Sequence, residues 1–148
     1  LERDLKLHYE SAMRYALPTS ILMFDLDNLK TINDTRGHHV GDEIIRAVAD
    51  ICRSTLRKTD SACRLGGDEF VVAMPKTDLE QAMRLARRLH ECFRQELGQY
   101  SAESVVVTAS MGVTAIAAED RSYEDTLKRA DRALYDAKNL GKDRIVSA

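Results

Sequence analysis

The chain has 148 residues and a formal net charge of −2; 44% of its residues are hydrophobic and 31% are charged. This length and composition suffice for one hydrophobic core, so we expect residues 1–148 to form a single domain. The near-neutral charge disfavours binding to a nucleic acid polymer. The apolar runs are too short to span a bilayer, so we expect no membrane contact by this domain either.

The N-terminal part of the chain predicts a helix, a strand and a second helix. Residues 1–16 form an amphipathic pattern that Pro18 stops, and the apolar run that follows predicts a buried strand at about residues 19–25. A short helix is expected at about residues 27–36, because Gly37 is a typical helix terminator. Since the chain begins inside a predicted helix without an initiator methionine, we expect it to be a fragment of a longer protein.

The middle of the chain predicts a long helix followed by a hairpin. Apolar residues recur at helical spacing over about residues 42–57, and we interpret the adjacent His38 and His39 before this helix as a turn. Two short apolar segments then flank a pair of glycines. They predict a hairpin over about residues 62–74.

Two further helices and two strands are expected in the C-terminal half. A helix at about residues 79–97 follows the capping residue Asp78, and β-branched residues predict a strand at about residues 105–114 that a glycine interrupts. A last helix spans about residues 122–140, and residues 144–146 are a candidate edge strand. Hairpin and crossover connections in one sheet indicate an α+β fold.

The three cysteines, Cys52, Cys63 and Cys92, are odd in number and widely spaced. This pattern is typical of reduced thiols and fits neither a disulfide framework nor a zinc site. We therefore expect a cytoplasmic domain without structural disulfides.

The tip of the predicted hairpin combines two glycines with two acids, Gly66-Gly67-Asp68-Glu69. Adjacent glycines permit positive φ angles and let a bulky ligand approach the backbone. The acids place negative charge where a polyphosphate could lie, an arrangement that makes sense only with a divalent cation between the two. By itself, the same pattern is also typical of a surface hairpin whose acids are solvated.

A second acidic strand end makes metal binding the stronger interpretation. The apolar run that starts at Ile21 ends in Asp25-Leu26-Asp27, and ligands tend to bind at the carboxyl ends of strands. Oxygen ligands such as the carboxylates of Asp25 and Asp68 suit Mg²⁺. The alternative for Asp25 alone is an acid that caps the following helix.

Three segments resemble the GGDEF domain of bacterial diguanylate cyclases, in the same order and with matching spacing over nearly the whole chain. They are Asp25-Leu-Asp-Asn-Leu-Lys-Thr-Ile-Asn-Asp-Thr-Arg-Gly-His38, Arg64-Leu-Gly-Gly-Asp-Glu-Phe70 and Ala130-Asp-Arg-Ala-Leu-Tyr-Asp-Ala-Lys-Asn-Leu-Gly-Lys142. The resemblance implies a ferredoxin-like nucleotide-cyclase core, with a mainly antiparallel five-stranded sheet flanked by helices. It also implies condensation of two GTP into cyclic di-GMP with release of two pyrophosphates.

The resemblance assigns one or two Mg²⁺ (or Mn²⁺) ions to Asp25, the carbonyl of Leu26, Asp68 and Glu69. Two such ions would activate the attacking oxygen and neutralise the departing pyrophosphate. By the same analogy Asp68 and Glu69 are the catalytic acids. Asp68 would help to deprotonate a ribose 3′-hydroxyl whose pKa the metal has lowered.

Phosphate contacts are implied for Lys30, Lys138 and Lys142, and the bare glycine turn at Gly66 and Gly67 would lie against the substrate. Lys138 and Lys142 are four residues apart on the predicted last helix, so we expect them to share a face. Lysines are more often simply solvated, and it is the family match that promotes these three. Lys142 stands where the family more often has arginine, so bidentate phosphate binding is lost.

Guanine contacts are implied for Asn33 and Asp42, with His38 as a further substrate contact. A carboxylate can accept both the N1–H and the N2–H₂ of guanine, which adenine cannot offer. The ordinary alternatives are a helix-end residue for Asn33 and a helix N-cap for Asp42. Asp42 could both cap the helix and contact guanine. The chain departs from the family at Leu29, where phenylalanine is frequent, and at Asp143, where asparagine is commoner.

The segment Arg57-Lys-Thr-Asp60 matches the family's Arg-x-x-Asp inhibitory product site, at the expected distance before the glycine pair. Arg57 would stack on a guanine or bind a phosphate, and Asp60 would accept guanine N–H groups. The alternative is a cation at a helix C-terminus followed by an acid in a turn.

These inferences together predict a metal-dependent diguanylate cyclase domain that is active as a homodimer. One nucleotide pocket supplies only one half of a two-fold product, so two copies must face each other, each with its own GTP. In the family, a preceding sensory segment imposes this dimerisation. The alternatives are a catalytically weak regulatory module that binds cyclic di-GMP or GTP, and a different nucleotide cyclase with the same fold.

Overall fold

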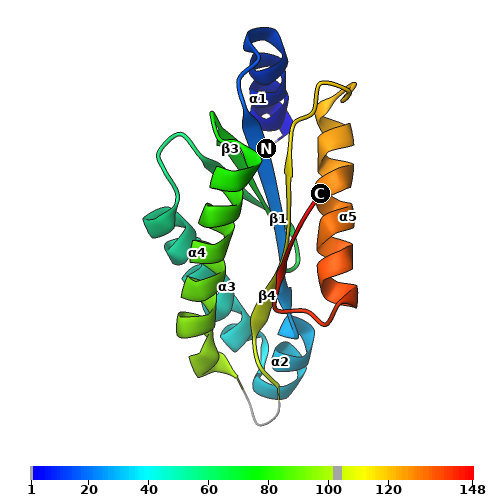
Figure 1. Ribbon diagram of the computed structural model, residues 1–148. Helices are drawn as coiled ribbons and strands as arrows, with labels where there is room; N and C mark the ends of the chain where they lie inside the picture. The colour runs from blue at the N-terminus through cyan, green and yellow to red at the C-terminus, as the bar shows by residue number, and fades with distance from the viewer. Residues whose placement is uncertain (1, 102–104) are drawn as a thin grey trace.

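The computed structural model describes residues 2–101 and 105–148, which form one sheet with helices packed against it (Figure 1). The strands are β1 (Thr19–Asp27), β2 (Ser61–Gly66), β3 (Glu69–Pro75), β4 (Thr108–Ala115) and β5 (Ile145–Ser147). The helices are α1 (Glu2–Tyr15), α2 (Leu29–Arg36), α3 (His38–Thr55), α4 (Leu79–Leu97) and α5 (Tyr123–Asn139), and a 3₁₀ turn covers Gly98–Tyr100. No helix within the described residues is both long enough and apolar enough to cross a membrane.

The sheet confirms the predicted α+β fold. Its five strands lie in the order β2-β3-β1-β4-β5. The pairs β2–β3, β3–β1 and β1–β4 are antiparallel, and only β5 at the edge runs parallel to its neighbour β4. The predicted hairpin therefore exists, and the candidate edge strand lies at one edge of the sheet.

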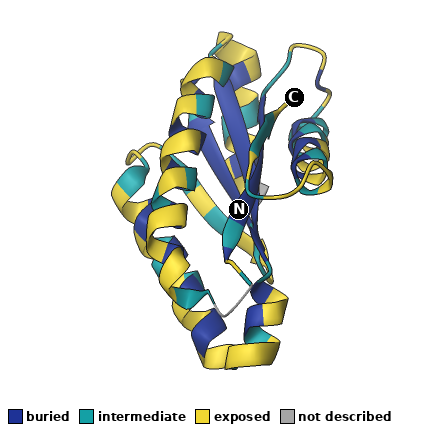
Figure 2. Cartoon of the chain, turned by 60° about the horizontal axis from the view of Figure 1, so that its bottom comes forward, coloured by how far each residue is buried: buried dark blue, intermediate teal, exposed yellow. Residues whose placement is uncertain are grey.

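Strand β1 lies at the centre of the sheet, and all nine of its residues are buried. Successive side chains of a strand point to opposite faces. Leu22, Phe24 and Leu26 belong to the larger core, which α3 and α4 cover, whereas Ile21 and Met23 belong to a smaller core under α1 and α5. Figure 2 shows the result: the central strands are buried, and exposed residues lie on the outer faces of the helices. Helices on both faces explain why this strand is a continuous apolar run.

Aromatic rings and a capped helix organise the larger core. The ring of Phe24 stacks on Phe70 at 4.9 Å between centroids and lies 5.3 Å from Phe93 of α4. Helix α4 begins with a capping box, in which Asp78 accepts from the Gln81 amide and the Gln81 side chain accepts from Asp78 N–H. The predicted cap and range of this helix are therefore confirmed.

All three cysteines are free, in agreement with the interpretation of their number and spacing. Cys52 lies in the larger core, and burial raises the pKa of its thiol to about 11. Cys63 and Cys92 are half-buried.

The turn predicted at His38 and His39 is wrong, because both residues lie in the first turn of α3. Gly37, at φ 93°, redirects the chain between α2 and α3, so the two helices follow each other without a longer connection. Within α3, a Cβ at Gly41 would overlap the side-chain amide of Asn33 on α2, so this glycine lets the two helices approach. Asp42 consequently lies inside α3, and its predicted role as helix N-cap is wrong.

Strand β4 begins later than the β-branched residues predict. Its first residue, Thr108, lies opposite Asp27, the last residue of β1. Beyond that point β1 offers no backbone partner, so residues 105–107 do not continue the strand despite their β propensity. Residue 105 forms only an isolated bridge.

The prediction that a glycine interrupts this strand is wrong, because β4 continues through Gly112. Gly112 instead lets α5 cross β4 closely. The residue pairs in register with Met23 of β1. A Cβ at this position would overlap the backbone oxygen of Ala130 and the backbone nitrogen of Leu134, and would lie 2.9 Å from the carbonyl carbon of Ala133. Backbone atoms of a packed helix cannot move aside as a flexible side chain can, so α5 needs a glycine here.

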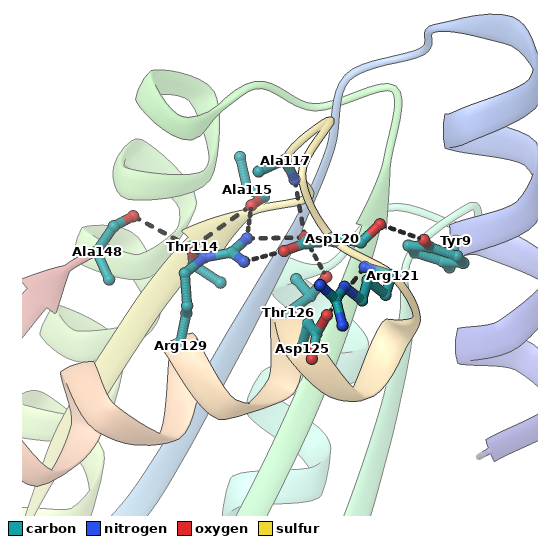
Figure 3. A network of polar contacts seen from close by, with 10 residues as sticks. All are labelled: Tyr9, Thr114, Ala115, Ala117, Asp120, Arg121, Asp125, Thr126, Arg129 and Ala148. Carbon is teal, nitrogen blue, oxygen red and sulfur yellow. Dashed lines mark hydrogen bonds and ion pairs between the residues drawn. The ribbon is translucent and has the colours of Figure 1, made fainter.

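A polar network holds the start of α5 at the end of the sheet where β1 begins (Figure 3). Arg129 of α5 forms an ion pair with Asp120 and donates to the carbonyl of Ala115. Burial alone would raise the pKa of Asp120, but the hydrogen bonds from Arg129, the Ala117 amide and Thr126 hold this pKa below its usual value. The hydroxyl of Tyr9 donates to the Asp120 carbonyl at 2.7 Å, which joins α1 to the same network.

We predict that Gly112→Ala destabilises the fold by about 2–3 kcal/mol, because the added methyl group forces α5 away from β4. Urea denaturation followed by circular dichroism measures this as a lower midpoint with an unchanged slope. The matched control is Gly98→Ala, where the backbone is helical and an added Cβ meets nothing within 4 Å. Equal midpoints for the two variants would contradict the close crossing of α5 over β4.

Candidate active site

The two acidic segments singled out in the sequence meet at one end of the sheet. Antiparallel pairing places the end of β1 beside the start of β3, with Asp25 opposite Glu69. The backbone N–H of Leu26 donates to the carbonyl of Asp68 at 3.1 Å, so the hairpin tip is attached directly to the end of β1. The expected convergence of Asp25, Leu26, Asp68 and Glu69 is therefore present.

Asp25 is the most perturbed acid of this end of the sheet. Its side chain is only 12% exposed and forms an ion pair with Lys138 of α5. Burial and the neighbouring carboxyl of Asp68 raise the pKa of Asp25 to about 6, against the opposing effect of Lys138. Burial, Asp131 and Asp68 likewise raise the pKa of Glu69. The carboxyl groups of Asp25, Asp68 and Glu69 thus have the same cation, Lys138, as their neighbour.

The oxygen ligands at this end of the sheet fit a magnesium ion with an open coordination sphere. The Oδ1 atom of Asp25 is buried, and no hydrogen-bond donor of the described residues reaches it. A buried carboxylate oxygen without a partner, beside a second carboxyl group, is an environment that a divalent cation relieves. No cluster of three or more acid, histidine or cysteine side chains forms a closed cage within the described part of the chain. Mg²⁺ does not need one, because it retains waters and shares phosphate oxygens.

Lys138 and Lys142 do not share a helix face, because α5 ends at Asn139 and Lys142 lies in the following turn at φ 64°. This corrects the expectation from their spacing. Both lysines still reach the end of β1: Lys138 pairs with Asp25, and Lys142 Nζ lies 3.4 Å from Oδ1 of Asn28. Burial lowers the pKa of Lys138, but Asp25 and Asp68 outweigh it and raise this pKa overall, so the ammonium stays charged.

A groove of about 440 Å³ lies between α2, α3 and the hairpin tip, and it collects most of the predicted substrate contacts. Its walls include the predicted residues Lys30, Asn33, His38, Asp42, Gly67 and Asp68. Gly66, Lys138 and Lys142 are not part of its lining. Because Asp42 does not cap a helix, its carboxylate remains available to a ligand in this groove.

Asn33 lines the groove and carries a second partnerless oxygen, which faces Gly41 of α3. Its Oδ1 is buried, and within residues 2–101 and 105–148 it has no hydrogen-bond donor. The residue lies in the last turn of α2, packed against Gly41 of α3. A buried acceptor without a partner costs about 1–3 kcal/mol unless a ligand satisfies it.

Sequence reasoning missed Arg64 as a functional residue, although it belongs to a segment that carries the family resemblance. Its Nε donates to the carbonyl of Gly67 at 2.7 Å and thereby fastens the glycine turn. Arg64 also lines the groove. A cation two residues before a glycine pair was the available signal. The remaining lining residues that the sequence did not predict are Leu29, which is buried, Asp34, Gly41 and Ile45.

A second cavity, of about 570 Å³, contains the predicted inhibitory residues Arg57 and Asp60. The Asp60 side chain is fully buried and accepts from the Arg57 backbone N–H at 2.9 Å, whereas its Oδ1 has no donor among the described residues. The Arg57 guanidinium lies 3.5 Å from Asp60 and donates to Thr77. Arg53, Lys58 and Arg64 add positive charge to the walls, so the cavity favours an anion.

Comparison with known proteins gives consistent matches. The family profile for "Diguanylate cyclase, GGDEF domain" matches residues 1–144. Response regulator PleD of Caulobacter vibrioides is 44% identical over 131 residues, which cover 87% of this chain and 29% of that protein. Diguanylate cyclase A of Treponema denticola is 39% identical over 126 residues, which cover 85% of this chain and 34% of that protein. The chain thus spans about a third of the length of these curated relatives.

Solved structures agree with the sequence matches. The active GGEEF domain of a diguanylate cyclase from Vibrio cholerae superimposes with a TM-score of 0.91 at 30% identity, covering 99% of this chain and 93% of that one. The GGDEF domain of DgcB from Caulobacter crescentus, solved in complex with c-di-GMP, gives a TM-score of 0.84 at 28% identity and covers 98% and 86% of the two chains.

We predict that Asp25→Asn stabilises the protein by about 1–2 kcal/mol at pH 7.5 in EDTA and has little effect at pH 4. The folded-state pKa of Asp25 lies above its unfolded value, so the folded state binds more protons between about pH 4 and 6. Stability therefore falls as the pH rises through that window. The asparagine variant has no proton to lose and escapes this fall.

Urea denaturation at both pH values measures the effect, with the exposed acid exchange Asp50→Asn as the control. A stability gain of Asp25→Asn that is the same at pH 4 and pH 7.5 would show that the carboxylates of this site do not repel one another.

Proposed function

Because the chain belongs to the GGDEF family of diguanylate cyclases, we propose that it condenses two GTP into cyclic di-GMP with release of two pyrophosphates. The observation that carries this proposal is the meeting of Asp25 and Asp68 beside a groove lined with basic and guanine-complementary side chains. The chain spans only part of the length of its relatives, so the proposal concerns the activity of this domain alone.

The residues that would hold Mg²⁺ or Mn²⁺ are Asp25, the carbonyl of Leu26, Asp68 and Glu69. The metal would supply positive charge to the triphosphate and lower the pKa of the attacking ribose 3′-hydroxyl. Asp68 lies at the groove and would accept the proton of this hydroxyl, while Glu69 would complete the metal site. The raised pKa of Asp25 supports the assignment, because acids that repel each other in a buried place gain most from a cation.

Selectivity for guanine would come from Asn33 and Asp42. The side chains of Asn33 and Asp42 both line the groove and would accept the N–H groups of the guanine edge, whereas adenine would leave at least one acceptor unpaired. Such an unpaired group costs about 1–3 kcal/mol, which corresponds to about tenfold to hundredfold preference for GTP over ATP. His38 borders the same groove and would contact the nucleotide between base and phosphates.

Cationic side chains would hold the triphosphate. Lys30 lines the groove directly, and Lys138 and Lys142 reach the end of β1 from the other side. The turn at Gly66 and Gly67 is bare, because a Cβ added at either glycine would meet nothing within 4 Å, so phosphates can approach its backbone.

The reaction requires two copies of the domain, because each groove holds one nucleotide and the product joins two. A homodimer with facing grooves would bring each 3′-hydroxyl to the α-phosphate of the other GTP. Dimerisation would therefore control the rate.

The second cavity supports product inhibition. It combines Arg57 with the buried, partly unsatisfied carboxylate of Asp60, and cyclic di-GMP offers both phosphates and guanine N–H groups to this pair. The same cavity also favours a second candidate function, a receptor for cyclic di-GMP with little turnover. The intact acids Asp68 and Glu69 speak against it, since a receptor has no need of metal ligands.

We predict that the purified chain forms cyclic di-GMP from GTP and Mg²⁺, at a rate that rises with the square of protein concentration while dimers are scarce. Mass spectrometry of the product and a pyrophosphate assay measure this. Asp68→Asn should lower the rate by about 10²-fold or more, because it removes a metal ligand and the proton acceptor. Glu80→Gln, an exposed acid of α4, is the matched control.

The cyclase proposal would be rejected if the chain formed no product even with dimerisation forced by a fused coiled coil. Binding of GTP without pyrophosphate release would instead indicate a regulatory GTP-binding module.

We predict that Arg57→Ala weakens binding of cyclic di-GMP by about tenfold to hundredfold, because the charge-assisted contacts to the ligand are lost. Calorimetry measures the affinity, and progress curves of the cyclase reaction should run to a higher product concentration before they slow. Arg84→Ala removes the same charge from the exposed face of α4 and serves as the control. Unchanged affinity in Arg57→Ala would place product binding elsewhere.

A further inference from the structure

The turn between α5 and β5 (residues 140–144) carries Lys142 in an unusual backbone conformation. Lys142 and Asp143 have φ angles of 64° and 48°, so two successive residues with a Cβ lie in the left-handed region. Residues other than glycine adopt this region rarely, and a pair in succession needs surrounding contacts that hold it. The contacts around this turn therefore decide where the Lys142 side chain starts.

Asp27, the last residue of β1, provides the first of these contacts. The residue is only 3% exposed, and its carboxylate accepts the backbone N–H of Asp143 at 3.1 Å. The hydroxyls of Thr108 and Ser110 on β4 donate to the same carboxylate at 2.7 and 2.8 Å. A buried carboxylate is tolerated only where hydrogen bonds replace water. Here those bonds join β1, β4 and the turn in one place.

Helix α4 holds the turn from the opposite side. The Asp143 carboxylate lies 2.8 Å from Nε2 of His90 and 3.9 Å from Nε of Arg94. The next residue, Arg144, accepts the backbone N–H of Met111 through its carbonyl at 2.9 Å, which begins the pairing of β5 with β4. Asp143 is thus bound through its backbone to β1, and its side chain lies against His90 and Arg94 of α4.

The fixed turn sends Lys142 toward the connection between β1 and α2. Its Nζ lies 3.4 Å from Oδ1 of Asn28, whose own amide donates to the carbonyl of Val106 at 2.8 Å. This places the ammonium close to the end of β1, where Asp25 and Lys138 meet. Lys142 is 114 residues away from Asn28 in sequence, so only the turn can bring it there.

We propose that Asp27 is a positioning residue for the triphosphate of the substrate, which acts by holding the turn that presents Lys142. This inference rests on the proposed function, because it takes Lys142 as a phosphate contact. The carboxylate of Asp27 needs no contact with substrate or metal in this role: its two oxygens are occupied by donors of the chain itself.

The test is Asp27→Asn, which keeps the size of the side chain but replaces one accepting oxygen with an amide that faces donors. We expect the KM for GTP to rise about tenfold with kcat within about twofold of the wild type, because triphosphate binding weakens while the reacting groups stay in place. Calorimetry should show the same loss of affinity for a non-hydrolysable GTP analogue and no loss for GMP.

A double-mutant cycle with Lys142→Ala separates positioning from general destabilisation. If Asp27 acts through Lys142, Asp27→Asn should add no further loss of analogue affinity in the Lys142→Ala background. Thr108→Val is the matched control, since it removes a donor to the same carboxylate but leaves the bond to Asp143 intact. It should lower the melting temperature without changing the KM.

His90→Leu tests the turn from the side of α4 and serves if Asp27→Asn does not fold. It should raise the KM for GTP about twofold to threefold, since the hydrogen bond from the Asp143 backbone to Asp27 remains. An unchanged KM and analogue affinity in both variants, or effects that add fully to those of Lys142→Ala, would overturn the proposal. A wild-type chain that binds the analogue but forms no product would reject the cyclase function and leave the affinity test of Asp27 valid.

Discussion

The structure depends on the electrostatic balance around Asp25, a carboxylate that the central strand carries into a nearly dry site. Antiparallel pairing with β3 forces the carboxyl of Asp68 close to it, and α5 supplies Lys138 as the single cation that pairs with it among the described residues. Two like charges in a buried place are unfavourable, and one lysine does not neutralise the site. The fold therefore maintains a local excess of negative charge at the end of β1, which folding alone would not require. The divalent cation of the proposed function would match this excess in charge and in ligand preference.

Sequence patterns predicted the elements well wherever the local signal and the tertiary partners agree. The capping box at Asp78 and the apolar residues that follow it at helical spacing define α4 locally. The apolar run of β1 forms a buried strand because helices cover both faces of the sheet. Two boundaries and one shared helix face were predicted wrongly, because a distant partner decides them. Helix α3 begins at His38, since Gly37 turns the chain sharply and Gly41 accepts the packing of Asn33; no capping signal in the sequence announces this.

The other two failures have the same origin. The β-branched residues before Thr108 do not extend β4, because the neighbouring strand β1 has ended at that level. Lys142 shares no helix face with Lys138, because the chain turns at Gly141 to bring β5 beside β4. In the candidate site, the motifs predicted the acids that meet at the end of β1, most of the substrate contacts that line the groove, and the pair Arg57 and Asp60 that lines the second cavity; the roles of these residues stay predictions. It could not reveal that Lys138 pairs with Asp25 or that Arg64 fastens the glycine turn, because both depend on contacts that form only in the folded chain.

The two cavities and the two ends of α5 show how few elements connect the parts of this domain. Ile45 of α3 and Arg64 of β2 line both the groove and the second cavity, so a ligand in either one contacts a residue that borders the other.

Helix α5 is about 25 Å long at 1.5 Å per residue. Arg129 fixes its first half to the network that includes Tyr9 of α1, and Lys138 at its far end pairs with Asp25. Since Gly112 lets this helix lie directly on β4, it cannot tilt without separating from the sheet. The position of Lys138 beside Asp25 is therefore set by rigid packing along the whole of α5, whereas the position of Lys142 is set by the turn that follows the helix.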